Sequence, residues 1–272
     1  MRIYISADIE GVAGVVTPMQ TVTDGKEWAR ACQWMTAEVS AAIDGAKAAG
    51  ATEFVVSDSH GSGQNLILDD LPGDVEVVRS WPRPLGMMQG VEHGDFDAAF
   101  LIGYHTGAHH GSGVLAHTMS GLLIHSVRLN GTLCSETMLS AAIGGHFGVP
   151  IALASGDDAY GDHIASQLPG TRFAQVKTAH GRFSARTKTP VHACHIIRNE
   201  AELALVGQRP LPFTLDGPLT LEVTFQKHIP AELLSYLPVF ERTDAHTIRA
   251  EAPDILGVSK MVKFITMVSY GS

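Results

Sequence analysis

The chain has 272 residues, of which 45% are hydrophobic and 17% charged, as in an ordinary globular protein with a sizeable core. Its 19 basic and 28 acidic residues give a net charge of -9, and no cluster of lysine or arginine marks a nucleic-acid surface. We therefore expect no nucleic-acid partner. The sequence has no apolar run of the roughly 18–20 residues that a membrane span needs, so we expect no membrane association either.

The cysteines bear on the cellular compartment. Cys32, Cys134 and Cys194 are odd in number and lack the CxxC spacing of a thiolate metal site. The N-terminus leads into a short strand without the apolar segment of a secretory signal. These features predict reduced thiols in a cytoplasmic protein.

Short apolar runs of strand length alternate along the chain with helical apolar stripes. This alternation predicts an α/β fold with a mainly parallel sheet and flanking helices. In chain order the predicted elements are a strand over Ile3–Ile5, a helix from Thr23 or Asp24 to Gly50, strands over Glu53–Val56, Val75–Val78 and Ala98–Ile102, a type I′ hairpin over 122–134, a helix over Thr137–His146, a strand over Val149–Ala154, a helix over Ala159–Leu168, a strand over Phe173–Val176, a helix from Pro190 to Leu205, strands over Leu219–Phe225 and Thr247–Ala250, and a final helix from Ile255 to about Tyr270.

The chain shows no internal repeat, low-complexity tract or obvious linker. We therefore expect residues 1–272 to form a single unit. Any second α/β domain would be intertwined with the first, because no composition change marks a boundary between them.

Two carboxylates follow the first strand. Asp8 and Glu10 are two residues apart, so they point to the same side if the strand persists that far. Converging negative charges are costly unless a positive charge lies between them, and a divalent metal ion commonly fills that role. In the alternative interpretation Asp8 caps the following loop and Glu10 is solvated.

Histidines follow the next two strong strands. His60 comes after Ser57-Asp58-Ser59, and His105 comes after Gly103-Tyr104. In open α/β sheets ligands bind beyond the carboxyl ends of the parallel strands. One histidine at a strand end is commonly structural, but several such ends that each deliver a carboxylate or an imidazole indicate a site.

Three further groups of polar residues have competing interpretations. Glu136 starts a predicted helix, where a lone glutamate is also favoured by the helix dipole. Asp157 and Asp158 follow a fourth strand, and we expect them to be helix-cap and turn residues at the start of the next helix. They remain candidates for contacts to the residues that bind the metal. His109 and His110 lie in a glycine-rich loop as an expected solvated pair.

His117 follows that loop in a mostly apolar segment. A histidine at the wall of a pocket is a plausible catalytic base. The competing interpretation is a half-buried histidine that is bonded to the backbone, and the sequence alone leaves both open.

One set of residues suits a metal centre: Asp8, Glu10, His60, His105 and Glu136. Mixed nitrogen and oxygen ligands suit zinc better than magnesium or copper. Five ligands exceed the need of a four-coordinate structural zinc, whereas two metal ions bridged by one carboxylate would use all of them.

The motifs that carry these residues resemble those of the D-aminopeptidase family of zinc peptidases, the DppA type once called dipeptide transport proteins. The matching segments are Ala7-Asp8-Ile9-Glu10-Gly11, Ser57-Asp58-Ser59-His60, Gly103-Tyr104-His105, Ala116-His117-Thr118-Met119, and Asn130-Gly131 leading to Glu136. Their order and approximate spacing match over nearly the whole chain. The loop between His105 and His117 departs from the family pattern, as does the spacing from His117 to Glu136.

The resemblance implies two zinc ions per subunit, with Asp8 as the bridging ligand and Glu10, His60, His105 and Glu136 as the others. It places His117 at the position of the family's proposed catalytic histidine. It also implies two intertwined α/β domains, a decamer that encloses an inner chamber, and short peptides with an N-terminal D-residue as substrates.

Two other functions fit the same residues. A metal-dependent amidase or phosphoesterase would use this site on a small substrate that is not a peptide. A peptide-binding protein without turnover would agree with the older family name, and for it we would expect a signal peptide.

Overall fold

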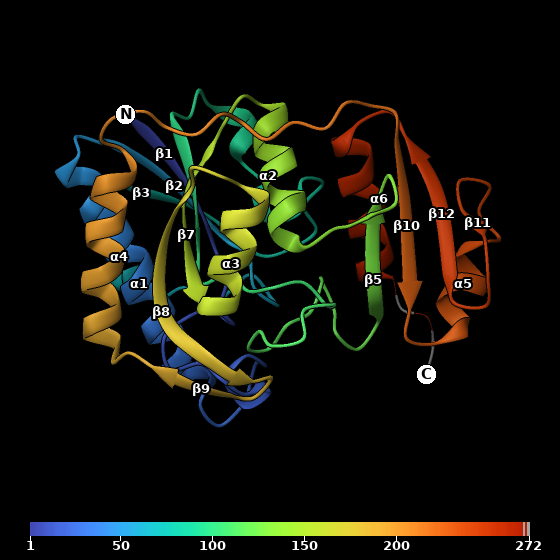
Figure 1. Ribbon diagram of the computed structural model, residues 1–272, viewed down its shortest axis with the longest axis horizontal. Helices are drawn as coiled ribbons and strands as arrows, with labels where there is room; N and C mark the ends of the chain where they lie inside the picture. Colours follow the sequence, from blue (N-terminus) through green and yellow to red (C-terminus); the bar gives the residue numbers. More distant parts are fainter. Residues whose placement is uncertain (269, 271–272) are drawn as a thin grey trace.

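The computed structural model describes residues 1–268 and 270, which form two sheets lying side by side (Figure 1). In the larger sheet the strand order is β3-β2-β1-β4-β7-β8-β9, and all neighbours are parallel except β8 and β9. Its strands are β1 (Arg2–Ala7), β2 (Glu53–Asp58), β3 (Val75–Val78), β4 (Ala98–Ile102), β7 (Ile151–Asp157), β8 (Arg172–Gly181) and β9 (Ser184–Thr187). The predicted α/β class with a mainly parallel sheet is confirmed.

Both faces of the larger sheet are covered by helices: α1 (Trp28–Ala48), α2 (Glu136–His146), α3 (Asp158–Gln167) and α4 (Pro190–Ala204). Alternate side chains of a strand point to opposite faces. Ile3 and Ile5 therefore pack into the core under α1 and α4, whereas Tyr4 packs on the other side with residues of α2 and α3. A strand buried on both faces explains the continuous apolar run in the sequence.

The smaller sheet is antiparallel, with the order β11-β12-β10-β5-β6. Its strands and helices are β5 (Ile124–Leu129), β6 (Thr132–Leu133), β10 (Leu219–Phe225), β11 (Glu241–Arg242), β12 (Thr247–Ala252), α5 (His228–Leu234) and α6 (Ile255–Met267). Asn130 and Gly131 connect β5 to β6 with φ values of 50° and 78°. Positive φ at both central residues is the type I′ turn that the sequence predicts.

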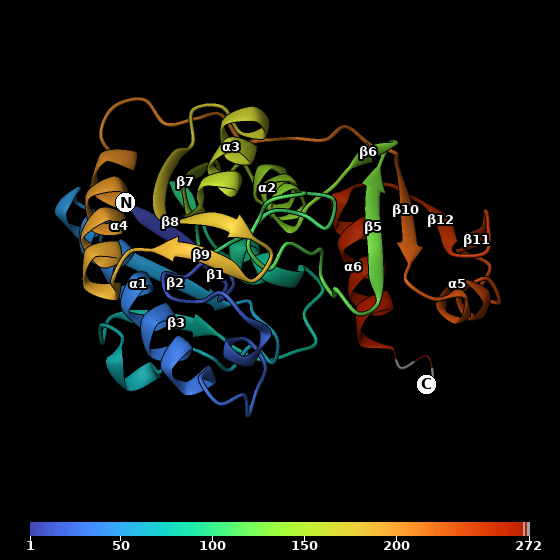
Figure 2. The ribbon, with the colours of Figure 1, turned by 60° about the horizontal axis from the view of Figure 1, so that its bottom comes forward.

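The chain passes between the sheets more than once. It leaves the larger sheet after β4 to make β5 and β6, returns through α2, and comes back to the smaller sheet at β10. Helix α6 packs against α2 as well as against β10 and β12, so it lies between the two sheets (Figures 1 and 2). Helix α6 also contacts the 3-10 helix Gly86–Met88, so the last helix comes close to an element from the first half of the chain.

Four short 3-10 helices lie in loops that border the larger sheet: Pro18–Gln20, Leu68–Asp70, Gly86–Met88 and Val91–His93. In the part of the chain that the structure describes, none of the helices is both long and apolar enough to cross a membrane.

The sequence places some element ends wrongly. Helix α1 begins at Trp28, because Asp24 adopts a left-handed φ of 68° in the preceding turn and cannot start a helix there. The strand predicted over Phe173–Val176 extends over Arg172–Gly181, since it also pairs with β9, which the sequence does not indicate. The final helix ends at Met267, and Ser269 within its predicted range lies outside the described residues.

Candidate metal centre

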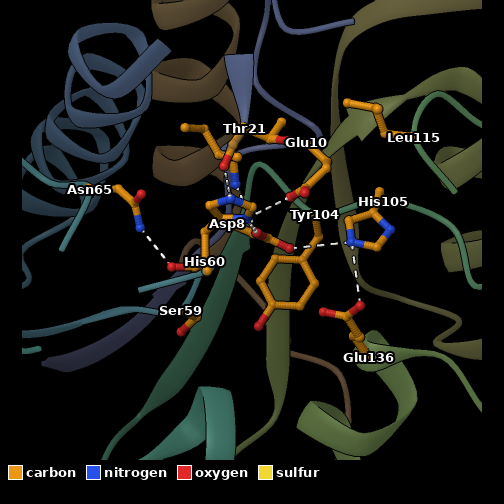
Figure 3. Close-up of polar contacts among 12 residues, drawn as sticks. Asp8, Glu10, Thr21, Ser59, His60, Asn65, Tyr104, His105, Leu115 and Glu136 are labelled. Atoms are coloured by element: carbon orange, nitrogen blue, oxygen red, sulfur yellow. Dashed lines mark hydrogen bonds and ion pairs between the residues drawn. The ribbon is translucent and has the colours of Figure 1, made fainter. Parts of the chain in front are cut away.

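The carboxyl edge of the larger sheet brings together all five predicted ligands (Figure 3). His117 lies there as well, beside His105 and Glu136. Asp8 and Glu10 follow β1, His60 follows β2, and His105 follows β4. Glu136 reaches the same place as the first residue of α2, whose N-cap is Ser135. The carboxylates are almost fully buried, with Asp8 2%, Glu10 4% and Glu136 5% exposed.

Two glycines let the first and third of these strand ends approach each other. A Cβ on Gly11 would lie 2.0 Å from the carbonyl oxygen of Tyr104, and one on Gly103 would lie 2.2 Å from that of Asp8. The Gly11 amide donates a hydrogen bond to the Gly103 carbonyl at 2.7 Å. Only glycine permits this contact, which fixes Asp8 and Glu10 beside His105.

Asp8, Glu10 and His60 form a first ligand group. His60 Nδ1 lies 3.1 Å from Asp8 Oδ1 and 3.0 Å from Glu10 Oε2. The other ring nitrogen, Nε2, lies 2.7 Å from the carbonyl oxygen of Thr21. Because a carbonyl only accepts, Nε2 carries the hydrogen, and in the neutral ring Nδ1 presents its lone pair to the carboxylates.

His105, His117 and Glu136 form a second ligand group. The Nδ1 atoms of His105 and His117 each lie 2.9 Å from a backbone carbonyl, that of Thr106 and that of Leu115. Both Nε2 atoms lie 3.6 Å from Glu136 Oε1, and the rings stack with their centroids 4.3 Å apart. The same carbonyl argument leaves both Nε2 lone pairs directed at the carboxylate.

Asp8 joins the two groups. Its Oδ1 faces His60, and its Oδ2 lies 3.4 Å from His105 Nε2. Among the described residues, the buried atoms Asp8 Oδ2, Glu10 Oε2 and His105 Nε2 have no hydrogen-bond partner. Buried polar atoms without partners are costly, and lone pairs that converge in this way match the first shell of a divalent cation. The ligand atoms of each group lie within 4.8 Å of one another, so the residues fit two metal ions.

The ionisation of the histidines supports this fit. Burial alone would lower the pKa of His105, but the Glu136 and Asp8 carboxylates outweigh burial and raise it to about 10. Burial would also lower the pKa of His60. The Glu10 and Asp8 carboxylates outweigh burial and raise this pKa well above its ordinary value. The metal-free cluster thus holds protons where positive charge is needed, and bound cations would replace them.

Comparison with known proteins agrees with this geometry. Residues 1–264 match the family model described as D-aminopeptidase. The chain belongs to the D-aminopeptidase family. A D-aminopeptidase of Bacillus subtilis (strain 168) is 28% identical over 263 residues, which cover 94% of this chain and 93% of the relative. The solved structure of the Zn-dependent D-aminopeptidase DppA from Bacillus subtilis, described as a self-compartmentalizing protease, matches 99% of each chain with a TM-score of 0.91 and 25% identity.

This D-aminopeptidase family member has a strained loop around His117. Leu115 and Met119 both adopt left-handed φ values, 54° and 62°, which are uncommon for residues other than glycine. The Met119 amide donates to Glu136 Oε1 at 2.6 Å, which fixes the loop to the metal centre. Strain of this kind clusters at active sites, yet nothing in the sequence pattern indicates it.

Two adjacent aspartates lie where β7 ends and α3 begins, and only Asp157 has the capping role that the sequence predicts. Asp157 caps α3 by accepting from the Tyr160 amide, and its other oxygen accepts from the Val114 amide at 2.7 Å. Asp158 Oδ1 accepts from the Ala179 amide. Asp157 therefore holds the start of the His117 segment in place. His109 and His110 are exposed, as expected.

A cavity of about 300 Å³ opens onto the centre, lined by Asp8, His60, His117 and Glu136. Two residues in its wall were not singled out from the sequence. Trp81 comes from the loop after β3, a stretch for which the sequence pattern predicts no element, and Lys263 comes from α6. Both reach the cavity through tertiary packing, so no local signal points to them.

Proposed function

We propose that this aminopeptidase removes N-terminal D-amino acids from short peptides and holds two zinc ions per subunit. The observation that carries the proposal is the pair of three-residue ligand groups at the carboxyl edge of the sheet, which Asp8 joins by lying 3.4 Å from His105 of the second group. Family membership and the likeness to a Zn-dependent D-aminopeptidase support the choice of metal and substrate. A mixed nitrogen and oxygen ligand set also suits zinc.

Asp8 is the bridging ligand in this proposal, because its two oxygens face opposite groups. Glu10 and His60 complete one zinc site, and His105 and Glu136 complete the other. Zinc held there would supply Lewis-acid chemistry, polarising the scissile carbonyl and acidifying water near neutral pH. The Thr21 and Thr106 carbonyls orient the ligand histidines by accepting their remaining N–H groups.

His117 is the proposed catalytic residue. Its Nδ1 hydrogen is held by the Leu115 carbonyl, which leaves Nε2 free to accept a proton. His117 is also 19% exposed at its side chain, whereas the ring of His105 is 2% exposed, so substrate and water can reach it. We assign it the removal of a proton from the attacking water and its delivery to the departing amine.

We propose that the chain is one unit of two intertwined α/β subdomains and assembles into a homo-oligomer, a decamer that encloses its active sites. The matched DppA structure is described as self-compartmentalizing, and the repeated passage of the chain between the two sheets supports the intertwined arrangement. A cytoplasmic location is also proposed, supported by three cysteines that form no disulfide.

Hydrolysis of D-Ala-D-Ala and L-Ala-L-Ala by zinc-reconstituted protein tests the function. We expect cleavage of the D-peptide and little of the L-peptide. Cleavage of the L-peptide alone would overturn the D-specificity. Failure to cleave either peptide, with zinc bound, would contradict the aminopeptidase assignment and favour a metal-dependent amidase or phosphoesterase.

A further inference from the structure

The cavity at the metal centre has charges of both signs. Its catalytic end carries the Asp8 and Glu136 carboxylates, while Lys263 is the one lysine or arginine among the described residues that line it. Lys263 belongs to α6, which packs against α2 and so brings a cation from the end of the chain to this cavity.

The ammonium group of Lys263 is held in place but not neutralised. Its Nζ lies 3.3 Å from the centroid of the Trp81 ring, a cation–π contact, and Trp81 is itself fixed by donating from Nε1 to the Gly61 carbonyl at 2.7 Å. In the part of the chain described by the structure, the ammonium group of Lys263 makes no ion pair within 4.0 Å and donates no hydrogen bond. Its N–H groups are therefore available to a ligand.

Arg83 is a second cation beside the Trp81 ring, and it has a structural role. Its guanidinium lies 4.3 Å from the Trp81 centroid, but its nitrogens donate to Ser57 Oγ and to the Asp58 and Val78 carbonyls. Arg83 is committed to holding the loop and does not line the cavity. Lys263 has no such partners.

Lys263 keeps its charge at neutral pH. Burial and the nearby Arg83 lower its pKa to about 8, and Glu136 partly opposes them. A half-buried ammonium beside an aromatic ring is less hydrated than one on the surface, which strengthens its attraction for an anion.

We propose that Lys263 binds the C-terminal carboxylate of the peptide substrate and so selects very short peptides; this inference rests on the aminopeptidase function proposed above. Substrate must place its N-terminal end near the acidic ligands, where its own carboxylate would be repelled. Two extended residues span roughly 7 Å, and 300 Å³ is at the lower end of ligand pockets. A cation in the wall of so small a cavity is placed to recognise the carboxylate of a dipeptide.

The test compares three substrates: D-Ala-D-Ala, its C-terminal amide, and D-Ala-D-Glu amide, whose only carboxylate is on a side chain. We expect wild-type protein to prefer the free acid over its amide by about 10- to 100-fold in kcat/KM, mainly through KM. Lys263→Met should remove this preference and leave kcat/KM for D-Ala-D-Ala amide within about twofold. Lys263→Arg should retain most of the preference.

Lys260→Met is the matched control, because Lys260 lies one turn earlier in α6, is exposed and does not line the cavity. It should preserve the wild-type preference. Zinc content and melting temperature of each variant show whether the metal centre and fold are intact, and Lys263→Gln replaces Lys263→Met if the latter misfolds.

Three outcomes would overturn the inference. The first is that wild-type protein cleaves D-Ala-D-Ala and its amide equally well. The second is that Lys263→Met keeps the wild-type preference. The third is that only cleavage of D-Ala-D-Glu amide depends on Lys263, which would mean that the lysine binds an acidic side chain of the substrate. In all three cases the wild-type protein still cleaves D-peptides, so the aminopeptidase function stands. Wild-type protein that cleaves none of the three substrates contradicts the proposed function itself.

Discussion

The two ligand groups of the metal centre are built from different kinds of structure. Asp8, Glu10 and His60 come from the ends of β1 and β2, which are adjacent parallel strands paired up to Ala7 and Asp58. The second group combines His105 from the end of β4 with His117 from a strained loop and Glu136 from a helix that follows the hairpin of the smaller sheet.

The two groups are therefore held in place by different interactions. Strand pairing fixes the first group, so its geometry is set by the backbone of the sheet. The second group depends on individual polar contacts, such as Asp157 to the Val114 amide and Glu136 to the Met119 amide. We therefore expect the first group to anchor metal and the second to be more sensitive to changes in loops.

Replacing Asp8 should have the largest effect, because it joins both groups. Asp8→Ala should lose bound zinc from both positions and all measurable peptidase activity, as measured by metal analysis and D-Ala-D-Ala hydrolysis. Asp74→Ala is the control, because it removes an exposed aspartate that pairs with Lys47 at the surface and should keep both zinc ions. An Asp8→Ala protein with full zinc would contradict the bridging role.

His117→Ala comes next. Since His117 is proposed to move protons, the variant should bind two zinc ions while turnover falls by about 10²- to 10⁴-fold. The structure also groups His117 with His105 and Glu136 around a possible ion. Loss of one zinc ion from the variant would make His117 a ligand. His110→Ala, which changes an exposed histidine, should behave as wild type.

The smallest expected effect concerns the support of the first group. Lys177 is buried and donates from Nζ to the carbonyls of Glu10, Val12 and Val15, the segment that carries a ligand. Lys177→Met removes the donor of the Glu10 and Val15 carbonyls, while the Val12 carbonyl keeps the Val15 amide. We therefore expect about 1–3 kcal/mol less stability and roughly 10- to 100-fold weaker zinc binding. Denaturant unfolding and zinc titration measure the two effects. Lys47→Met, at a surface ion pair with Asp74, should change neither.

Lys177 should also make the stability of the protein depend on pH. Burial lowers the pKa of Lys177 from 10.5 to about 8. Between these values the unfolded chain binds more protons than the folded one, so this residue adds to the free energy of unfolding as pH rises from 8 to 10.5. Lys177→Met should lack that gain. Parallel pH profiles of the two proteins would contradict the lowered pKa.

Only part of the metal centre and its cavity could be predicted from the sequence. Asp8, His60 and His105 could be predicted because each follows a recognisable buried strand, and parallel strand ends share one edge. Glu136 was recognisable only through the hairpin and helix around it. Lys177, Trp81 and Lys263 could not be predicted, since each reaches the centre through packing between elements far apart in the chain.

The start of α1 was missed for a local reason. Asp24 and Glu27 have the spacing of a capping box, but Asp24 is in the left-handed region and Gly25 packs against the Met19 carbonyl, where a Cβ would lie 2.2 Å away. The turn before the helix therefore overrides the capping pattern. The local geometry of this turn, which the sequence pattern does not record, decides the boundary.

The proposed metal centre depends above all on Asp8 as the ligand between two metal ions. Anomalous diffraction at the zinc edge from crystals of the zinc-reconstituted protein tests it most directly. We predict two peaks about 3.5–4 Å apart, one beside Glu10 and His60 and one beside His105 and Glu136, with Asp8 between them. A single peak, or two peaks of which only one contacts Asp8, would contradict the account.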